Sequence, residues 1–109
     1  MWYSFNRANV HYVVISTETD YPHSFYQTQF GDQLKWLDQD LASAVSQRSA
    51  RPWIVVGGHR PLYSNHHDFV DFNSKNTTCW PHGQAEIVTR AFESLFMKYN
   101  VDLVFGIYL

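Results

Sequence analysis

The clearest strand signal in this chain lies in Arg51-Pro52-Trp53-Ile54-Val55-Val56-Gly57-Gly58-His59. Four consecutive apolar residues, three of them β-branched, lie between a proline and a pair of glycines. A short apolar run without alternation predicts a strand that is buried on both faces, as in a parallel sheet. Proline disfavours helix in the residue before it, so a helix preceding this strand ends by Arg51.

Similar apolar runs lie on either side of this strand in the sequence. His11–Ser16 is a second β-branched run with apolar residues on both faces, and Val101–Phe105 is a third. Both predict further buried strands, which the same reasoning favours as parallel. Trp2–Phe5 predicts a shorter strand ahead of them.

The segments between the strands have helical spacing. Gly31 to Val45 predicts a helix, and the residues that fall on its apolar stripe are Leu34, Leu37, Leu41 and Val45. Gln84 to Tyr99 predicts a second helix, which Asn100 ends in a left-handed cap. Thr17–Gln29 and Arg60–Gly83 lack periodicity and are predicted loops, and a loop as long as the second is usually functional or mobile.

The order strand, helix, strand, loop, helix, strand predicts an α/β fold. Its strands should be parallel and joined by right-handed crossovers. In such sheets ligands gather outside the carboxyl ends of the strands. Two places therefore qualify as a functional site, namely Gly57-Gly58-His59 and the chain from Gly106 onward.

Composition excludes several classes of protein. The 109 residues form one domain at most, and 45% of them are apolar, so a packed core is expected. The net charge of -2 provides no basic surface for nucleic acid. No apolar run approaches the roughly 20 residues that span a bilayer. The start of the chain has no charged segment followed by an apolar stretch, so no signal peptide is expected.

Cys79 is the single cysteine, so neither an internal disulfide nor a cysteine zinc cluster can form. It is interpreted either as a small buried side chain or as half of a disulfide to sequence outside this chain. Asn76-Thr77-Thr78 is a sequon for N-glycosylation, which matters only in a secretory pathway.

Three histidines are candidates for chemistry. His59 follows a buried strand and two glycines that allow close approach of a ligand, so it could bind a divalent metal; alternatively it hydrogen-bonds the loop backbone. His66 and His67 could protonate a leaving group at mildly acidic pH, or they could be polar surface. The other three histidines and four of the aspartates have no metal-ligand spacing and are interpreted as structural: His11, His23, His82, Asp20, Asp38, Asp40 and Asp102.

The chain resembles the purple acid phosphatases, which are calcineurin-like metallophosphoesterases. The resemblance rests on five consecutive blocks that extend over nearly the whole chain. These blocks are Met1–Asn6 (MWYSFN), Val14–Asp20 (VISTETD), Gln33–Leu37 (QLKWL), Arg51–Pro61 (RPWIVVGGHRP) and Lys98–Phe105 (KYNVDLVF).

The resemblance implies a sheet sandwich flanked by helices, of which this chain forms part, and a metal-dependent acid phosphatase acting on phosphate monoesters. The family holds Fe(III) together with Fe, Zn or Mn(II), and its members are often secreted, vacuolar or lysosomal. His59 corresponds to the family's histidine ligand of the divalent metal. His66 and His67 resemble the paired histidines that hold phosphate and protonate the leaving oxygen in plant members.

The departures from the family pattern also lead to expectations. Residues 1–109 are expected to be a partial catalytic domain without the N-terminal metal motifs. The C-terminal Gly-His-x-His motif is replaced by Gly106-Ile107-Tyr108-Leu109. The chain alone is therefore expected to bind no metal tightly, to be inactive, and to associate through exposed sheet edges. The alternatives are a degenerate, non-catalytic paralogue acting as a binding or regulatory module, and adventitious zinc binding by His59, His66 and His67.

Overall fold

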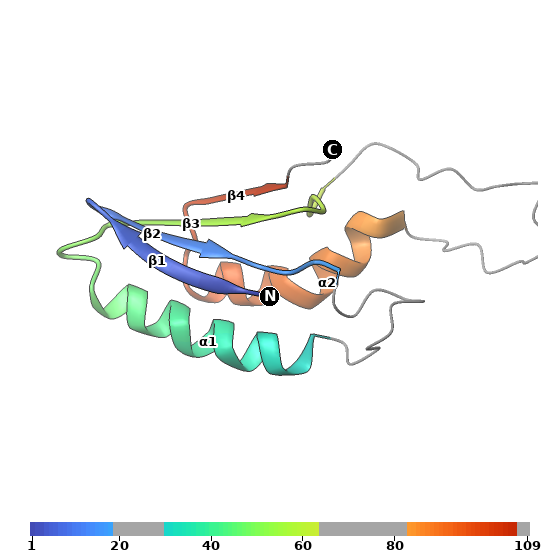
Figure 1. Cartoon of the computed structure of the whole chain (residues 1–109), viewed down its shortest axis with the longest axis horizontal. Coiled ribbons are helices and arrows are strands. Elements are labelled where there is room, and N and C mark those ends of the chain that lie inside the picture. Colours follow the sequence, from blue (N-terminus) through green and yellow to red (C-terminus); the bar gives the residue numbers. More distant parts are fainter. Residues whose placement is uncertain (19–29, 64–82, 107–109) are drawn as a thin grey trace, which may run out of the picture.

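The computed structural model describes residues 1–18, 30–63 and 83–106. Over these residues the chain forms four strands and two helices in a mixed α/β arrangement (Figure 1). The elements, in chain order, are β1 (Tyr3–Arg7), β2 (Val10–Val14), α1 (Gly31–Ser46), β3 (Trp53–Gly58), α2 (Gly83–Lys98) and β4 (Leu103–Gly106). The predicted elements are therefore confirmed, with no end shifted by more than two residues.

The strands form one sheet in the order β1-β2-β3-β4. Strands β2, β3 and β4 are parallel, as predicted, with Val13 opposite Val56 and Val56 opposite Val104. Strand β1 instead pairs antiparallel with β2. The physical reason is the short connection between them: two residues can join only antiparallel strands, and Ala8 has the positive φ of 52° that a tight turn requires.

Both helices lie on the same side of the sheet, where the core forms (Figure 1). Alternate residues of the central strands point into this core and meet the inner sides of α1 and α2. The side chains buried there include Val13, Ile15, Ile54, Val56, Leu37, Leu41, Phe92 and Phe96. The helices therefore cover one face of the sheet, while the register of β2, β3 and β4 aligns their carboxyl ends.

The predicted stripe of α1 was wrong in part. Leu37 and Leu41 are fully buried, but Val45 is 37% exposed and Leu34 is only partly buried. Gln33 and Ala44 complete the buried stripe instead. Relative to the predicted stripe, the buried side of α1 is shifted toward Gln33. The reason is that the Gln33 side-chain amide forms two hydrogen bonds with the backbone of Ser16, just after β2.

The other face of the sheet is apolar and is covered by none of the described elements. Its large exposed side chains are Tyr3, Phe5, Trp53, Leu103 and Phe105. The Phe5 ring stacks on Tyr12 of β2 with 5.1 Å between ring centroids. The expectation that the strands are buried on both faces is therefore not met within these residues, since the helices cover one face only.

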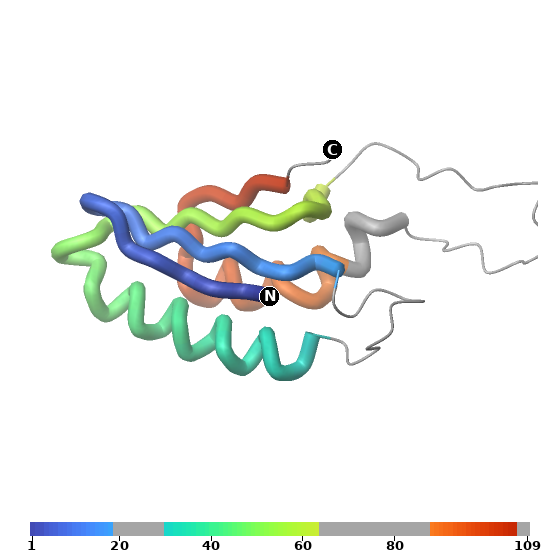
Figure 2. The backbone as a smooth tube through the Cα atoms, in the orientation of Figure 1, coloured from blue at the N-terminus to red at the C-terminus, as the bar shows by residue number. Residues whose placement is uncertain are grey.

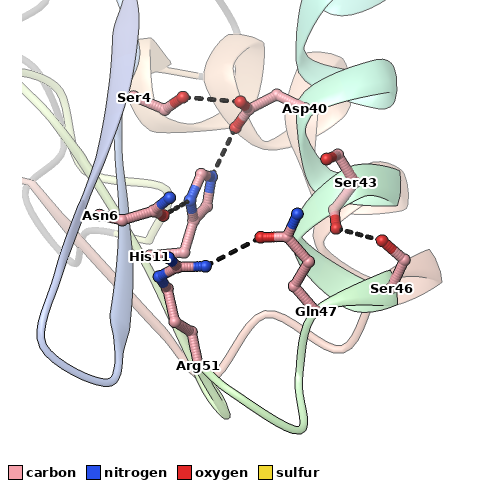
Figure 3. Close-up of polar contacts among 8 residues, drawn as sticks. All are labelled: Ser4, Asn6, His11, Asp40, Ser43, Ser46, Gln47 and Arg51. Atoms are coloured by element: carbon pink, nitrogen blue, oxygen red, sulfur yellow. Dashed lines mark hydrogen bonds and ion pairs between the residues drawn. The ribbon is translucent and has the colours of Figure 1, made fainter.

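A buried polar cluster joins the β1–β2 hairpin to α1 (Figure 3). The His11 ring is 8% exposed; its Nδ1 lies 2.6 Å from Asn6 Oδ1 and its Nε2 lies 2.7 Å from Asp40 Oδ2. The Ser4 hydroxyl donates to the other carboxylate oxygen of Asp40 at 2.6 Å. His11 and Asp40 thus have the structural role predicted for them, and the cluster satisfies polar groups that would otherwise be buried without partners.

Asp40 makes the stability of the fold depend on pH. Burial raises the pKa of this carboxyl, but the hydrogen bonds from His11 and Ser4 and the charge of His11 lower it more, so the net pKa lies below the ordinary 3.8. As pH falls, the unfolded chain therefore binds the proton first. The stabilisation by ionised Asp40 is complete above pH 3.8 and is lost as pH falls through the lower pKa of the folded chain.

An Asp40→Asn variant is expected to lose about 1–3 kcal/mol of unfolding free energy at pH 7, since Asn cannot carry the charge that His11 faces. The difference from the unchanged chain should shrink at pH 3. Urea titrations at both pH values measure it, with Asp32→Asn on an exposed position of the same helix as the control. An unchanged difference at pH 3 would contradict the assignment.

Candidate functional site

The carboxyl ends of β2, β3 and β4 meet at one edge of the sheet (Figure 2). His59 follows directly after β3 at this edge, and its side chain is exposed. This is where the sequence predicted a functional residue. A position just beyond the carboxyl end of a parallel strand is the one that the metal-binding interpretation assumes for His59.

The end of β2 is fixed to its neighbours by hydrogen bonds. The Ile15 N–H donates to the Gly57 carbonyl at 2.9 Å, which extends the pairing of β2 and β3. Gln33 is 1% exposed; its Oε1 accepts from the Ser16 N–H at 2.7 Å and its Nε2 donates to the Ser16 carbonyl at 2.8 Å. Sequence reasoning missed this role of Gln33, although a single glutamine beside a leucine stripe at the start of a helix is a usable signal.

Arg60 and Glu18 form an ion pair beside His59. Arg60 Nη2 donates to Glu18 Oε2 at 2.9 Å, and Arg60 Nε lies 2.7 Å from Glu18 Oε1 without the alignment of a hydrogen bond. The Arg60 side chain is 13% exposed and that of Glu18 is 48% exposed. The Glu18 carboxylate is therefore neutralised by a guanidinium group, which leaves it poorly suited to binding a cation.

Thr17 connects the same two segments. It is 1% exposed, and its hydroxyl accepts the Arg60 N–H at 3.0 Å and donates to Glu18 Oε1 at 3.3 Å. The sequence interpretation gave no role to Thr17, Glu18 or Arg60. Arg60 lies 43 positions from Thr17 and 42 from Glu18, and only the pairing of β2 with β3 brings it close to them.

The glycines at this edge allow protein segments to approach one another. A Cβ on Gly58 would lie 3.0 Å from Ile15 Cγ1 and 3.1 Å from Thr17 Cγ2. A Cβ on Gly106 would lie 2.6 Å from the backbone of Pro61. The sequence interpretation held that Gly57 and Gly58, which form the end of β3, admit a ligand; at Gly58 the close contact is instead with Ile15 and Thr17, which follow β2.

The loop after Arg60 is also attached to α2. The Thr89 hydroxyl donates to the Leu62 carbonyl, and the Tyr63 hydroxyl donates to Glu93. The hydrogen bond to the Glu93 carboxylate raises the pKa of the Tyr63 phenol. A pocket of about 320 Å³ beside the loop is lined mainly by apolar side chains, and its one carboxylate, Glu93, is the partner of Tyr63.

The other described aspartates have partners within the fold. Asp102 Oδ2 accepts the Ile54 N–H at 2.8 Å and lies 3.3 Å from Arg48 Nη1. Asp38 pairs with Lys98 and with the Tyr99 hydroxyl, and these two hydrogen bonds lower its pKa. The interpretation of Asp38 and Asp102 as structural is consistent with these contacts.

The donors at the strand edge fit one ligand position of a metal site. Within residues 1–18, 30–63 and 83–106, no three histidine, cysteine, aspartate or glutamate side chains come together as a group that could hold a metal. Among the described residues at the carboxyl ends of the strands, His59 has an exposed imidazole, whereas the Glu18 carboxylate is paired with Arg60. Further ligands would have to come from elsewhere. Several predicted residues lie outside the described ones, namely His66, His67, Asn76, Cys79, His23, His82 and Asp20.

Neither α1 nor α2, the helices in the part of the chain that the structure describes, has the length and hydropathy of a membrane-spanning segment. No protein-family model matches the chain, and no solved structure gives a significant match.

Curated sequences match nearly the whole chain. It is 34% identical over 103 residues to acid phosphatase type 7 of Homo sapiens, covering 94% of this chain and 23% of that protein. It is 37% identical over 123 residues to acid phosphatase A of Cryphonectria parasitica, covering 96% and 20%. It is 34% identical over 106 residues to purple acid phosphatase 22 of Arabidopsis thaliana, covering 97% and 20%. The chain thus spans about a fifth to a quarter of the length of these relatives.

Proposed function

Because this chain belongs to the purple acid phosphatase family, we propose that it is part of an acid phosphatase that hydrolyses phosphate monoesters at a binuclear metal centre. It would supply the carboxyl ends of the parallel strands β2, β3 and β4 to that enzyme's active site. The observation that carries the proposal is the position of His59: it follows β3 at the carboxyl edge of the parallel strands, in a chain whose relatives are acid phosphatases over almost its full length. Residues 1–109 would then be part of the catalytic domain.

His59 is proposed as a ligand of the divalent metal. A neutral imidazole donates a nitrogen lone pair to Zn, Fe or Mn, and its place on a strand end keeps that nitrogen fixed relative to the sheet. When bound, a metal pair in such a centre neutralises charge on the phosphoryl group and activates water. The family's pairing of Fe(III) with Fe, Zn or Mn(II) is part of this proposal.

His66 and His67 are proposed to hold the phosphate group and to protonate the leaving oxygen. Histidine has an ordinary pKa near 6.5, so at mildly acidic pH the side chain carries the proton that the leaving oxygen needs. The same charge attracts the phosphate dianion. Asn76 is proposed as a glycosylation site in the whole protein.

The 109-residue polypeptide is proposed to be inactive by itself. A binuclear centre needs several ligands at fixed distances, whereas the described part of this strand edge offers the single imidazole of His59. The relatives are four to six times longer than the matched segment, which covers 16–24% of their lengths, so they have room for the other ligands.

The experiment compares the polypeptide with a chimera. The matching segment of a full-length acid phosphatase is replaced by this chain, and both proteins are assayed for metal-dependent hydrolysis of p-nitrophenyl phosphate. We expect turnover by the chimera and none by the polypeptide. A chimera that is folded and monodisperse but binds no metal would overturn the proposal and favour a non-catalytic binding module.

The isolated polypeptide is further proposed to self-associate through its sheet. Edge strands β1 and β4 leave backbone groups unpaired within the described structure, and the uncovered face places Phe5 and Leu103, which are 45% and 54% exposed, on these two strands. A Phe5→Lys, Leu103→Lys variant should have a lower apparent mass in light scattering.

The matched control for association is Met97→Lys. Met97 is 72% exposed on α2, which lies on the side of the sheet opposite to the uncovered face. One lysine there, against two in the sheet variant, should leave the mass almost unaltered. An equal effect of both variants would mean that net charge, and not the sheet, governs association.

A further inference from the structure

Thr17, which lies just after β2, contacts both neighbours of His59 in the sequence, Gly58 and Arg60. On the N-terminal side, the position of a Gly58 Cβ would be 3.1 Å from Thr17 Cγ2, so the backbone there lies against the threonine methyl group. On the C-terminal side, the Arg60 N–H donates to Thr17 Oγ1 at 3.0 Å. Thr17 is 1% exposed and thus cannot move aside without disturbing the core.

The Arg60 side chain adds a second attachment to the same end of β2. Its guanidinium folds back onto Glu18, with contacts of 2.7 and 2.9 Å to the two carboxylate oxygens. A guanidinium that meets both oxygens of a carboxylate is held in direction as well as in distance. Because Glu18 is half exposed, solvent screens the pair, so its main effect is on local geometry and not on global stability.

The loop beyond Arg60 is attached separately. Pro61 lies against the backbone of Gly106 in β4, and Leu62 accepts a hydrogen bond from Thr89 of α2. Loss of the contacts to Thr17 and Glu18 would therefore loosen the short stretch around His59 without detaching the loop from β4 and α2.

We propose that Thr17, Glu18 and Arg60 are positioning residues that hold the main chain on both sides of His59 and so fix the direction in which its imidazole leaves the strand edge. The functional consequence rests on the proposed role of His59 as a metal ligand. Metal ligands must be held to within about 0.5 Å of their productive positions, and groups that orient a ligand commonly change metal affinity by about 10–100-fold.

The test in the metal-free chain uses Thr17→Val and Arg60→Lys. Valine keeps the shape of threonine but cannot accept the Arg60 N–H, and lysine keeps the charge but cannot contact both Glu18 oxygens. Hydrogen exchange at the Arg60 amide should accelerate by about 10-fold in Thr17→Val, as expected for the loss of one hydrogen bond. In both variants the ¹⁵N relaxation of His59 should report greater motion, while the amides of Ile15 and Ile54 stay protected.

Arg48→Met is the matched control. Arg48 also forms an ion pair, with Asp102, and donates to the carbonyls of Tyr99 and Asn100 beyond the end of α2. These contacts are near the N-terminal ends of β3 and β4, so this variant should accelerate exchange there and leave the Arg60 amide unchanged. If Thr17→Val and Arg60→Lys change all amides equally, or leave Arg60 and His59 unaltered, the positioning role is refuted.

A second measurement separates this inference from the proposed function. In the full-length chimera, Thr17→Val should raise the dissociation constant of the divalent metal by about 10–100-fold. Arg60→Glu alone should also weaken metal binding, and the double variant Glu18→Arg, Arg60→Glu, which exchanges the two charges, should recover part of the lost affinity. Greater motion around His59 in the metal-free variants would support the positioning role. Unchanged metal binding by the His59→Ala chimera would refute the role of His59 as a metal ligand, whatever the result in the metal-free chain. Unchanged metal affinity in Thr17→Val, when His59→Ala abolishes binding, would overturn the positioning proposal.

Discussion

A His59→Ala substitution is expected to lower the activity of the chimera by more than about 100-fold. Removing a group that merely orients a metal ligand commonly lowers metal affinity or activity by about 10–100-fold, so removing the ligand itself should lower them more. Alanine removes the imidazole from the carboxyl edge of β3, and the neighbouring Glu18 cannot replace it because it is paired with Arg60. The measurement is kcat/KM for p-nitrophenyl phosphate together with the metal content of the purified protein.

The control for His59→Ala is a change at the opposite end of the same strand. Arg51 immediately precedes Pro52 and donates to Gln47 Oε1 on the surface (Figure 3), so Arg51→Ala should leave kcat/KM within about twofold, as is usual for surface changes. A His59→Ala chimera that retains full activity and stoichiometric metal would exclude His59 as a ligand.

A Phe92→Ala substitution is expected to destabilise the fold by about 3–5 kcal/mol. Phe92 is 0% exposed, and its ring lies 4.9 Å from that of Phe30 and 6.1 Å from that of Phe96. Removing it leaves a cavity between α2 and the sheet. Small domains have only about 5–15 kcal/mol of stability in total, so the variant should be largely unfolded at conditions where the parent chain is folded.

Urea denaturation followed by circular dichroism measures this loss. Met97→Ala, at a 72% exposed position of the same helix, is the control and should change the unfolding free energy by less than about 0.5 kcal/mol. A Phe92→Ala effect below about 1 kcal/mol would mean that the cluster of Phe30, Phe92 and Phe96 is not the centre of the core.

The regular elements were predictable because their signals are local. The β-branched runs at His11–Ser16 and Trp53–Val56 and the helical spacing of Gly31–Val45 each depend on neighbours within one element. Asn100 has the predicted left-handed conformation, with φ of 51°, for the same reason. The strand β1 was predicted but its antiparallel pairing was not, since the pairing depends on Ala8 adopting a positive φ, which alanine seldom does.

The candidate site was predictable in part. His59 was identified because any residue that follows a buried strand of a parallel sheet lies at its carboxyl edge. The groups that hold its neighbours, Thr17, Glu18 and Arg60, carry no local signal of their role. The assignments of His66 and His67 remain predictions from the sequence resemblance.

Local patterns in the sequence specify which segments are strands and helices, which strand precedes His59, and which family the chain belongs to, because periodicity and ordered motif blocks are properties of consecutive residues. The pairing of Arg60 with Glu18, the burial of Gln33 against Ser16 and the apolar sheet face that the described elements leave uncovered arise from the folded arrangement of the segments. These features join residues 17 to 42 positions apart. Such contacts depend on the register of β2 against β3 and on the side of the sheet that both helices occupy, and neither is encoded within a single segment.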